Sequence, residues 1–157
     1  MKKLLIFFVL LVATTCLVRG AEFVVNNCPV TPVREEPSEA AEQSTQLLFG
    51  ELCEVEERKS RWVKVRSTID GQVGWVSAKM TTPVGEEAIR LLGERAIGVV
   101  AKPMAVVTAT ETGEKLMLTI GTRLPNYTNG TFEVLGKQYQ IDSTCVYTLE
   151  NQGHEAI

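Results

Sequence analysis

Short runs of Val, Leu, Ile and Thr, broken by Gly, Pro, Asn and Asp, make up most of this 157-residue chain. Runs of this length between turn residues are typical of β-strands. In residues 62–66 the alternation places Val63 and Val65 on one face of a strand and Trp62 on the other. Five or six such strands within about 60 residues predict a small barrel. We therefore expect an all-β fold.

A weak internal repeat indicates that the barrel occurs twice. Residues 47–51 parallel 118–122, and residues 71–76 parallel 136–141, which makes Trp75 and Tyr139 the matching aromatic residues of the two repeats. The expected domains are residues 21–82 and 97–150, followed by a polar tail at 151–157. Domains this small bury little surface, so we expect them to pack on each other or on the segment between them.

The linker at 83–96 contains the one stretch with a helical pattern. Residues 85–93 place acids in the first turn, Arg90 near the end and Gly93 just past it. This arrangement suits the helix dipole and a glycine C-cap. The sequence thus predicts a short helix joining the two barrels.

Residues 1–20 have the features of a secretory signal peptide. Lys2 and Lys3 precede ten apolar residues at 4–13, too few for a transmembrane helix, which needs about 20. We predict cleavage after Gly20 and export to the periplasm or the extracellular space, with no membrane span. Cys16 leaves open a lipoprotein signal, which is less favoured because no small residue directly precedes it.

Charge and histidine content exclude several classes of function. The first 20 residues hold three of the 16 cationic residues and none of the 19 acidic ones, so the remainder is more acidic than the net charge of −3 for the whole chain. This argues against nucleic-acid partners, which require a basic surface. The one histidine is His154, and we expect neither a metal site nor a cofactor.

Three cysteines remain after the signal peptide, and none forms a CxxC pair. We interpret Cys53 as a small buried apolar residue. A Cys28–Cys53 disulfide is the alternative in an oxidising compartment. Cys145 lies only nine residues before His154, and we interpret the two as a core cysteine and a solvated tail rather than a catalytic pair.

Four segments of the first repeat together resemble the bacterial SH3 domain that precedes the catalytic domain of NlpC-type cysteine peptidases. They are residues 33–38, 46–51, 61–65 and 70–76. Residues 121–127 and 132–134 give the second repeat a weaker resemblance to the second SH3 domain of the same enzymes. The resemblance implies an all-β fold of two small SH3-like barrels joined by a short linker helix.

NlpC-type peptidases cut between γ-D-glutamate and a diamino acid in the stem peptides of peptidoglycan. Their nucleophile lies in an Asp-Cys-Ser context that Asp142-Ser143-Thr144-Cys145 does not match. The resemblance therefore implies the accessory part of such an enzyme without a catalytic Cys-His pair, and we expect no enzymatic activity.

Four residues are candidates for ligand binding. In the family, an acid in the Arg-x-x-Pro-Ser loop helps to hold the free amine of the stem peptide. This acid corresponds to Glu36, in the loop that Arg34 opens. A tyrosine that assists it is replaced here by Gln72, which puts amine recognition in doubt. Trp62 either lines a peptide groove, as in other SH3 domains, or packs against the polar loop.

These observations lead to two functional hypotheses. The first is an exported, non-catalytic tandem SH3-like protein that recognises peptidoglycan, in particular its stem peptide. The alternative is the accessory or regulatory half of an NlpC-type endopeptidase whose catalytic domain is a separately encoded partner. A purely structural envelope protein without a ligand is a third, weaker interpretation.

Overall fold

The computed structural model describes residues 20–93 and 97–149. The predicted signal sequence with Cys16, and the polar tail with His154, lie outside these residues. Within the described ranges the protein is all-β apart from one α-helix and two short 3-10 helices, as expected. No helix in this part of the chain is both long and apolar enough to cross a membrane.

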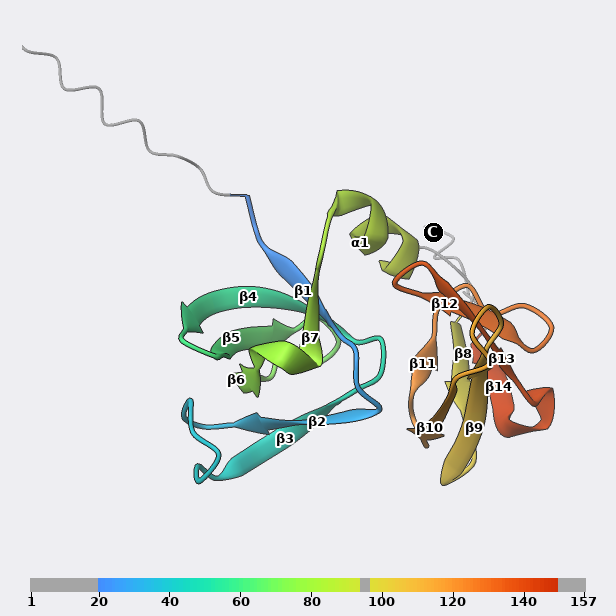
Figure 1. Cartoon of the computed structure of the whole chain (residues 1–157), viewed down its shortest axis with the longest axis horizontal. Coiled ribbons are helices and arrows are strands. Elements are labelled where there is room, and N and C mark those ends of the chain that lie inside the picture. The colour runs from blue at the N-terminus through green and yellow to red at the C-terminus, as the bar shows by residue number, and fades with distance from the viewer. Residues whose placement is uncertain (1–19, 94–96, 150–157) are drawn as a thin grey trace, which may run out of the picture.

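The N-terminal half, residues 20–84, forms one seven-stranded sheet in the order β3-β2-β6-β5-β4-β1-β7 (Figure 1). Its elements are β1 Phe23–Asn26, β2 Val30–Arg34, β3 Gln43–Leu48, β4 Leu52–Lys59, β5 Trp62–Ser67, β6 Val73–Ser77, the 3-10 helix η1 Ala78–Met80, and β7 Thr81–Val84. The sequence predicts five or six strands. Residues 33 and 34 begin the segment that resembles the family's polar loop, but both belong to β2, where Val33 is buried and pairs with Thr45 of β3.

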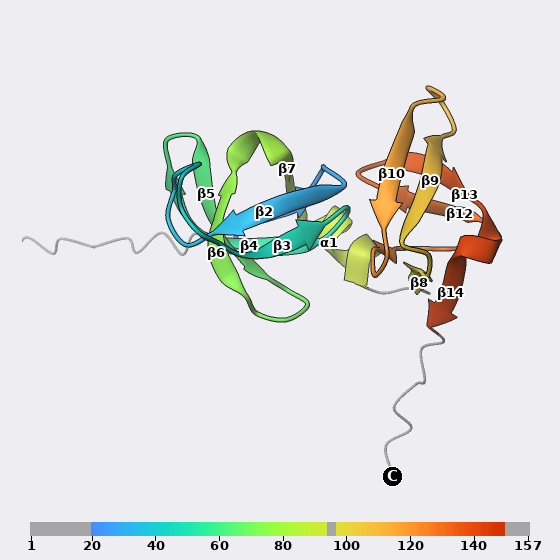
Figure 2. The same ribbon diagram turned by 90° about the horizontal axis from the view of Figure 1, so that it is seen from below.

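The C-terminal half, residues 97–149, repeats the same order of elements (Figures 1 and 2). They are β8 Ile97–Val100, β9 Met104–Ala109, β10 Lys115–Thr119, β11 Arg123–Leu124, β12 Thr131–Val134, β13 Lys137–Ile141, the 3-10 helix η2 Ser143–Cys145, and β14 Val146–Leu149. They form a four-stranded sheet, β10-β9-β13-β12, and a three-stranded sheet, β11-β8-β14. Helix α1, Glu86–Gly93, joins the halves close to its predicted position.

Matching backbone hydrogen bonds confirm the internal repeat. The Gly50 N–H donates to the Asn26 carbonyl oxygen at 2.9 Å, and the Gly121 N–H donates to the Val100 carbonyl oxygen at the same distance. Both glycines have positive φ, 79° and 86°, a conformation that glycine adopts without steric cost. The repeated Gly50 and Gly121 therefore mark the same turn in each half.

The expected equivalence of Trp75 and Tyr139 is wrong. Gly74 and Tyr139 each lie four residues before the 3-10 helix of their half, so Tyr139 corresponds to Gly74. A Cβ atom at position 74 would lie 2.9 Å from the Arg34 carbonyl oxygen, because β2 crosses β6 closely there. The strand crossing therefore requires the glycine in the first repeat, whereas the second repeat accommodates a large ring.

The two halves share one apolar core. Val25 and Phe49 of the N-terminal half join a cluster otherwise built from the C-terminal half, and Leu92 of α1 packs against it. The Phe49 ring meets Tyr139 edge to face, with centroids 5.6 Å apart. A second cluster lies within the N-terminal half and includes Val63 and Val65, as their strand alternation predicts. The two repeats therefore pack on each other, which is one of the two expected alternatives, and Leu92 adds the helix to the same cluster.

One buried amide, that of Asn26, joins three segments of the N-terminal half. Its Nδ2 donates to the carbonyl oxygens of Cys28, Leu47 and Leu48 at 2.9, 3.2 and 2.9 Å. Its Oδ1 accepts a hydrogen bond from the Thr31 hydroxyl at 2.6 Å. The side chain is fully buried and its hydrogen-bonding capacity is used, so it fixes the end of β3 and the turn that follows.

We expect Asn26→Ala to lower the free energy of unfolding by about 3 kcal/mol, because it removes the amide that donates to the Cys28, Leu47 and Leu48 carbonyl oxygens and accepts from the Thr31 hydroxyl. The matched control is Asn27→Ala, whose side-chain amide donates to the Thr82 hydroxyl at 3.1 Å, and whose loss should cost about 1 kcal/mol. Urea unfolding measures both values. Equal losses would contradict the central role of Asn26.

Gly50→Ala tests the contact between the halves. Alanine at positive φ costs roughly 1–2 kcal/mol, and its Cβ would lie 3.3 Å from Val134 Cγ2 of the C-terminal half. Gly71→Ala is the matched control, because its φ is 74° and no atom lies within 4 Å of the added Cβ. We expect the Gly50 variant to lose more stability on urea unfolding. If the two variants lose the same amount, position 50 does not contact Val134 in solution.

Candidate functional site

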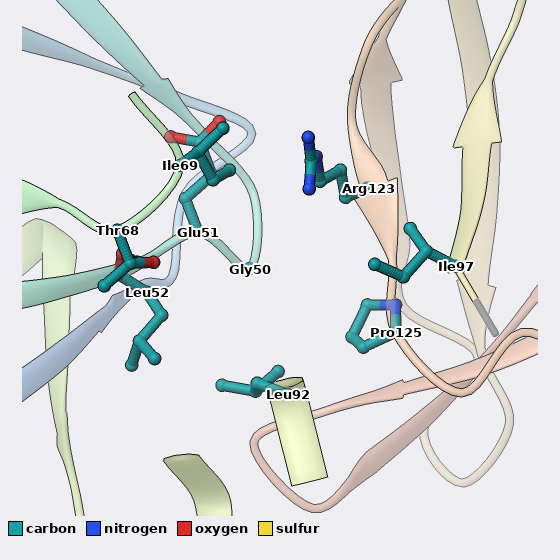
Figure 3. A pocket seen from close by; sticks show the side chains of 9 residues that line it. All are labelled: Gly50, Glu51, Leu52, Thr68, Ile69, Leu92, Ile97, Arg123 and Pro125. Atoms are coloured by element: carbon teal, nitrogen blue, oxygen red, sulfur yellow. Dashed lines mark hydrogen bonds between the residues drawn. The ribbon is translucent and has the colours of Figure 1, made fainter. Parts of the chain in front are cut away.

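A pocket of about 270 Å³ lies between the two halves (Figure 3). Its lining combines apolar side chains with one acid and one base: Gly50, Glu51, Leu52, Thr68, Ile69, Leu92, Ile97, Arg123 and Pro125. The N-terminal half, α1 and the C-terminal half all contribute. The pocket therefore exists only because the two halves pack together.

The turn between β3 and β4 positions the acid. The Glu51 N–H donates to the Leu48 carbonyl oxygen at 3.2 Å, and the Glu51 carbonyl oxygen accepts from the Asn26 N–H at 2.9 Å. Arg123 is the first residue of β11, on the opposite side of the pocket. Its guanidinium extends towards the N-terminal half (Figure 3).

The two charged groups face the pocket without pairing directly. Among the ion pairs between described residues, none includes Glu51 or Arg123. Burial raises the pKa of the Glu51 carboxyl above its ordinary value, and the nearby Asp70 charge raises it further; a hydrogen bond from the Leu48 backbone and the Arg123 charge act in the opposite direction. The carboxyl is therefore partly desolvated without a fully compensating partner.

Gln72 borders this pocket from the side of the N-terminal half. It lines a second cavity of about 40 Å³ together with Asp70, and this cavity shares Glu51 and Ile69 with the larger pocket. The lining of the small cavity does not extend to Arg34, Glu36 or Trp62. Of the four predicted ligand-binding residues, Gln72 is thus the one that lies beside the pocket.

Arg34 holds the loop that carries Glu36. Its Nη1 donates to the Ala41 carbonyl oxygen at 2.7 Å, and its Nη2 lies 3.7 Å from the Glu39 carboxylate. The loop is also closed by the Glu35 N–H, which donates to the Glu42 carbonyl oxygen at 3.0 Å. Glu36 is exposed in this loop, so its carboxylate is accessible from solvent.

Trp62 lies far from Gln72. It starts β5, whereas Ser67 ends β5 and donates its N–H to the Gln72 carbonyl oxygen. The intervening length of strand is about 16 Å. The Trp62 side chain is only 5% exposed, which favours the packing interpretation over a peptide groove. The structure therefore does not bring the four predicted residues into one site, and their binding roles remain predictions.

The described cysteines are all free thiols, so the alternative of a Cys28–Cys53 disulfide is wrong. Cys53 is fully buried in the core of the N-terminal half, as its interpretation as a small apolar residue predicts. The Cys28 thiol instead donates to the Asn27 side-chain oxygen at 3.3 Å. Burial raises the pKa of Cys53 to about 12, which keeps it protonated and unreactive. In the described part of the chain, no three His, Cys, Asp or Glu side chains are placed to hold a metal ion.

Sequence reasoning missed both charged residues of the pocket. The repeat nevertheless contains a signal, because the positions of Glu51 and Leu52 correspond to Thr122 and Arg123 in the second half. The same turn forms with threonine in place of Glu51, so the fold does not require the acid. A charge that one repeat has and the other lacks points to a role beyond folding.

Comparison with known proteins agrees with this architecture. Residues 33–79 match the family model of the bacterial dipeptidyl-peptidase Sh3 domain. The chain is also similar to the crystal structure of an NlpC/P60 family protein from Bacillus cereus, with a TM-score of 0.68 and 18% identity over 82% of this chain and 56% of that one. A search among curated proteins gives no match.

Two further solved structures are less similar. NlpC2 and NlpC1 from Trichomonas vaginalis each give a TM-score of 0.36, with 9% and 11% identity. They cover 81% and 80% of this chain, which spans 48% and 45% of theirs.

The family match confirms, for residues 33–79, the resemblance to a bacterial SH3 domain inferred from residues 33–38 and 70–76. The Bacillus cereus structure shows that the chain shares the fold of part of an NlpC/P60 family protein. The chain spans 56% of the length of the Bacillus cereus protein.

The raised pKa of Glu51 predicts a pH-dependent stability. The folded state binds the Glu51 proton more tightly than the unfolded state, so this stabilisation is complete below the ordinary pKa of 4.5 and is lost as the pH rises through the folded pKa. Glu51→Gln removes the ionised form. We expect the free energy of unfolding of Glu51→Gln to exceed that of the wild type, and we expect this difference to be larger at pH 7 than at pH 4.

Urea unfolding at the two pH values measures this difference. Glu35→Gln, an exposed position in the loop after β2, is the control for removing one negative charge. If the difference between Glu51→Gln and the wild type does not depend on pH, the carboxyl is not desolvated in solution.

Proposed function

We propose that this chain is an exported, non-catalytic binding protein of the bacterial cell wall, built from two SH3-like barrels, which recognises peptidoglycan stem peptides. The observation that carries the proposal is the match of residues 33–79 to the bacterial dipeptidyl-peptidase Sh3 domain. The repeated order of elements supports a second barrel of the same kind at residues 97–149. A cell-wall location agrees with the NlpC relationship.

The state of the cysteines supports binding rather than catalysis. Cysteine peptidases need a thiolate beside an imidazole base. Cys53 is buried among apolar side chains, with a pKa of about 12. Cys145 lies in η2, in a sequence context that differs from the Asp-Cys-Ser of the peptidases. Neither environment favours a reactive nucleophile.

Glu36 is the residue through which the loop after β2 would recognise the ligand. Arg34 holds the loop from within, which limits the conformational entropy lost on binding. The exposed Glu36 carboxylate can accept a charge-assisted hydrogen bond from the free amine of a stem peptide. Because Gln72 lies outside this loop, beside the pocket between the halves, it is not required for this contact.

Sedimentation with isolated peptidoglycan sacculi tests the proposal. The purified protein should pellet with sacculi, and soluble stem peptide should release it. Glu36→Gln should weaken binding by about tenfold, equivalent to about 1.4 kcal/mol, whereas the adjacent Glu35→Gln should bind like the wild type. Protein that remains in the supernatant, or pelleting that stem peptide does not reverse, would contradict stem-peptide recognition.

The second candidate function is that of an accessory half of an NlpC-type endopeptidase. The observation that favours it is the similarity to an NlpC/P60 family protein along 56% of that protein's length. Reading the DNA that follows the coding region tests this idea. A downstream frame that encodes Asp-Cys-Ser and a later histidine would support a separate catalytic partner, and its absence there would count against it.

A further inference from the structure

The pocket between the halves presents one negative and one positive group to the same small volume. Glu51 comes from the turn after β3, and Arg123 comes from β11 of the other half. Leu52, Ile69 and Leu92 add apolar side chains to the lining, with Leu52 and Leu92 on one side of the two charged residues (Figure 3). Opposite charges that line one pocket without pairing match a ligand that carries both charges itself.

Both charged groups gain from such a ligand. The Glu51 carboxyl is partly desolvated, so an ammonium group would supply the compensating charge and hydrogen bonds that burial has removed. The Arg123 side chain donates none of the side-chain hydrogen bonds described for residues 20–93 and 97–149, and its planar guanidinium suits a carboxylate in a bidentate arrangement. Asp70, close enough to raise the Glu51 pKa, adds to the attraction for an ammonium group.

The dimensions of the pocket limit the size of the ligand. Its volume of about 270 Å³ is just below the usual range of roughly 300–1,000 Å³ for small-molecule sites. An amino acid or a dipeptide fits such a volume better than a longer polymer. The apolar wall favours an aliphatic side chain over a polar one.

We propose that this pocket binds a short zwitterionic peptide, with its ammonium group at Glu51, its carboxylate at Arg123 and an aliphatic side chain against Leu52 and Leu92. The site is separate from the Glu36 loop and does not depend on binding to the cell wall. Because its walls come from both halves, the ligand bridges them.

Isothermal titration calorimetry of the full protein with L-alanyl-L-leucine tests this site. The free dipeptide should bind, and both N-acetyl-L-alanyl-L-leucine and L-alanyl-L-leucinamide should bind at least tenfold more weakly, because each lacks one terminal charge. Glu51→Gln and Arg123→Gln should each weaken binding of the free dipeptide by at least tenfold. The exposed positions Glu35 and Arg61 provide control variants, Glu35→Gln and Arg61→Gln, that should bind like the wild type.

Three results would overturn the proposal. The first is that the dipeptide shows no detectable binding at 10 mM, a concentration that corresponds to a binding free energy of about 3 kcal/mol. The second is that the blocked analogues bind as tightly as the free dipeptide. The third is that both pocket variants bind the dipeptide with unchanged affinity. Urea unfolding of each variant shows whether it is folded, so that loss of the site is distinguished from loss of structure. Sedimentation with sacculi tests cell-wall binding separately. If the protein does not pellet with sacculi, the calorimetric result for the dipeptide site still stands.

Discussion

The hydrogen bonds of the buried Asn26 amide are the constraint on which the rest of the structure depends. They fix the carbonyl groups of Leu47 and Leu48, and therefore the direction in which the chain turns after β3. That turn sends Phe49 towards the C-terminal half and Glu51 towards the pocket. One polar side chain thus orients both the contact that joins the halves and the acid of the candidate site. The second repeat forms the same turn with Val100 at the equivalent position, so the Asn26 side-chain bonds secure the turn in the N-terminal half alone.

The contact between the halves is a continuation of a core, not a surface association. Phe49 packs on Tyr139, which stacks on Phe132 with ring centroids 5.3 Å apart. Gly50 lets the backbone approach Val134 because it has no side chain. The pocket is the space left beside this packed region, where Leu92 of α1 closes one wall. Its shape is consequently set by tightly packed neighbours.

Local patterns in the sequence were sufficient for the strands, the helix and the repeat. Alternation fixed the core face of β5, and turn glycines located Gly50 and Gly121, because both signals act over a few residues. The predicted equivalence of Trp75 and Tyr139 is wrong because it pairs the two residues by their aromatic side chains. Their positions relative to the 3-10 helices differ by one residue. The pair Glu51 and Arg123 could not be found this way, since the packing of two halves, which no local pattern specifies, brings them to one pocket. Glu36 and Gln72 correspond to two separate motifs that act together in the family, yet here Glu36 lies in an exposed loop and Gln72 lines a small cavity.

The insertion of Phe49 into the core of the other half has a consequence for how such a protein evolves. A recombination event with its breakpoint in α1 would give each descendant an uncovered apolar face, one bearing Phe49 and one bearing Tyr139. Substitutions on one face would be tolerated only when the opposite face accommodates them. The two repeats have similar folds but are inherited as a single unit. Sequence changes at the contact face of one repeat are limited by the residues of the other repeat that pack on it.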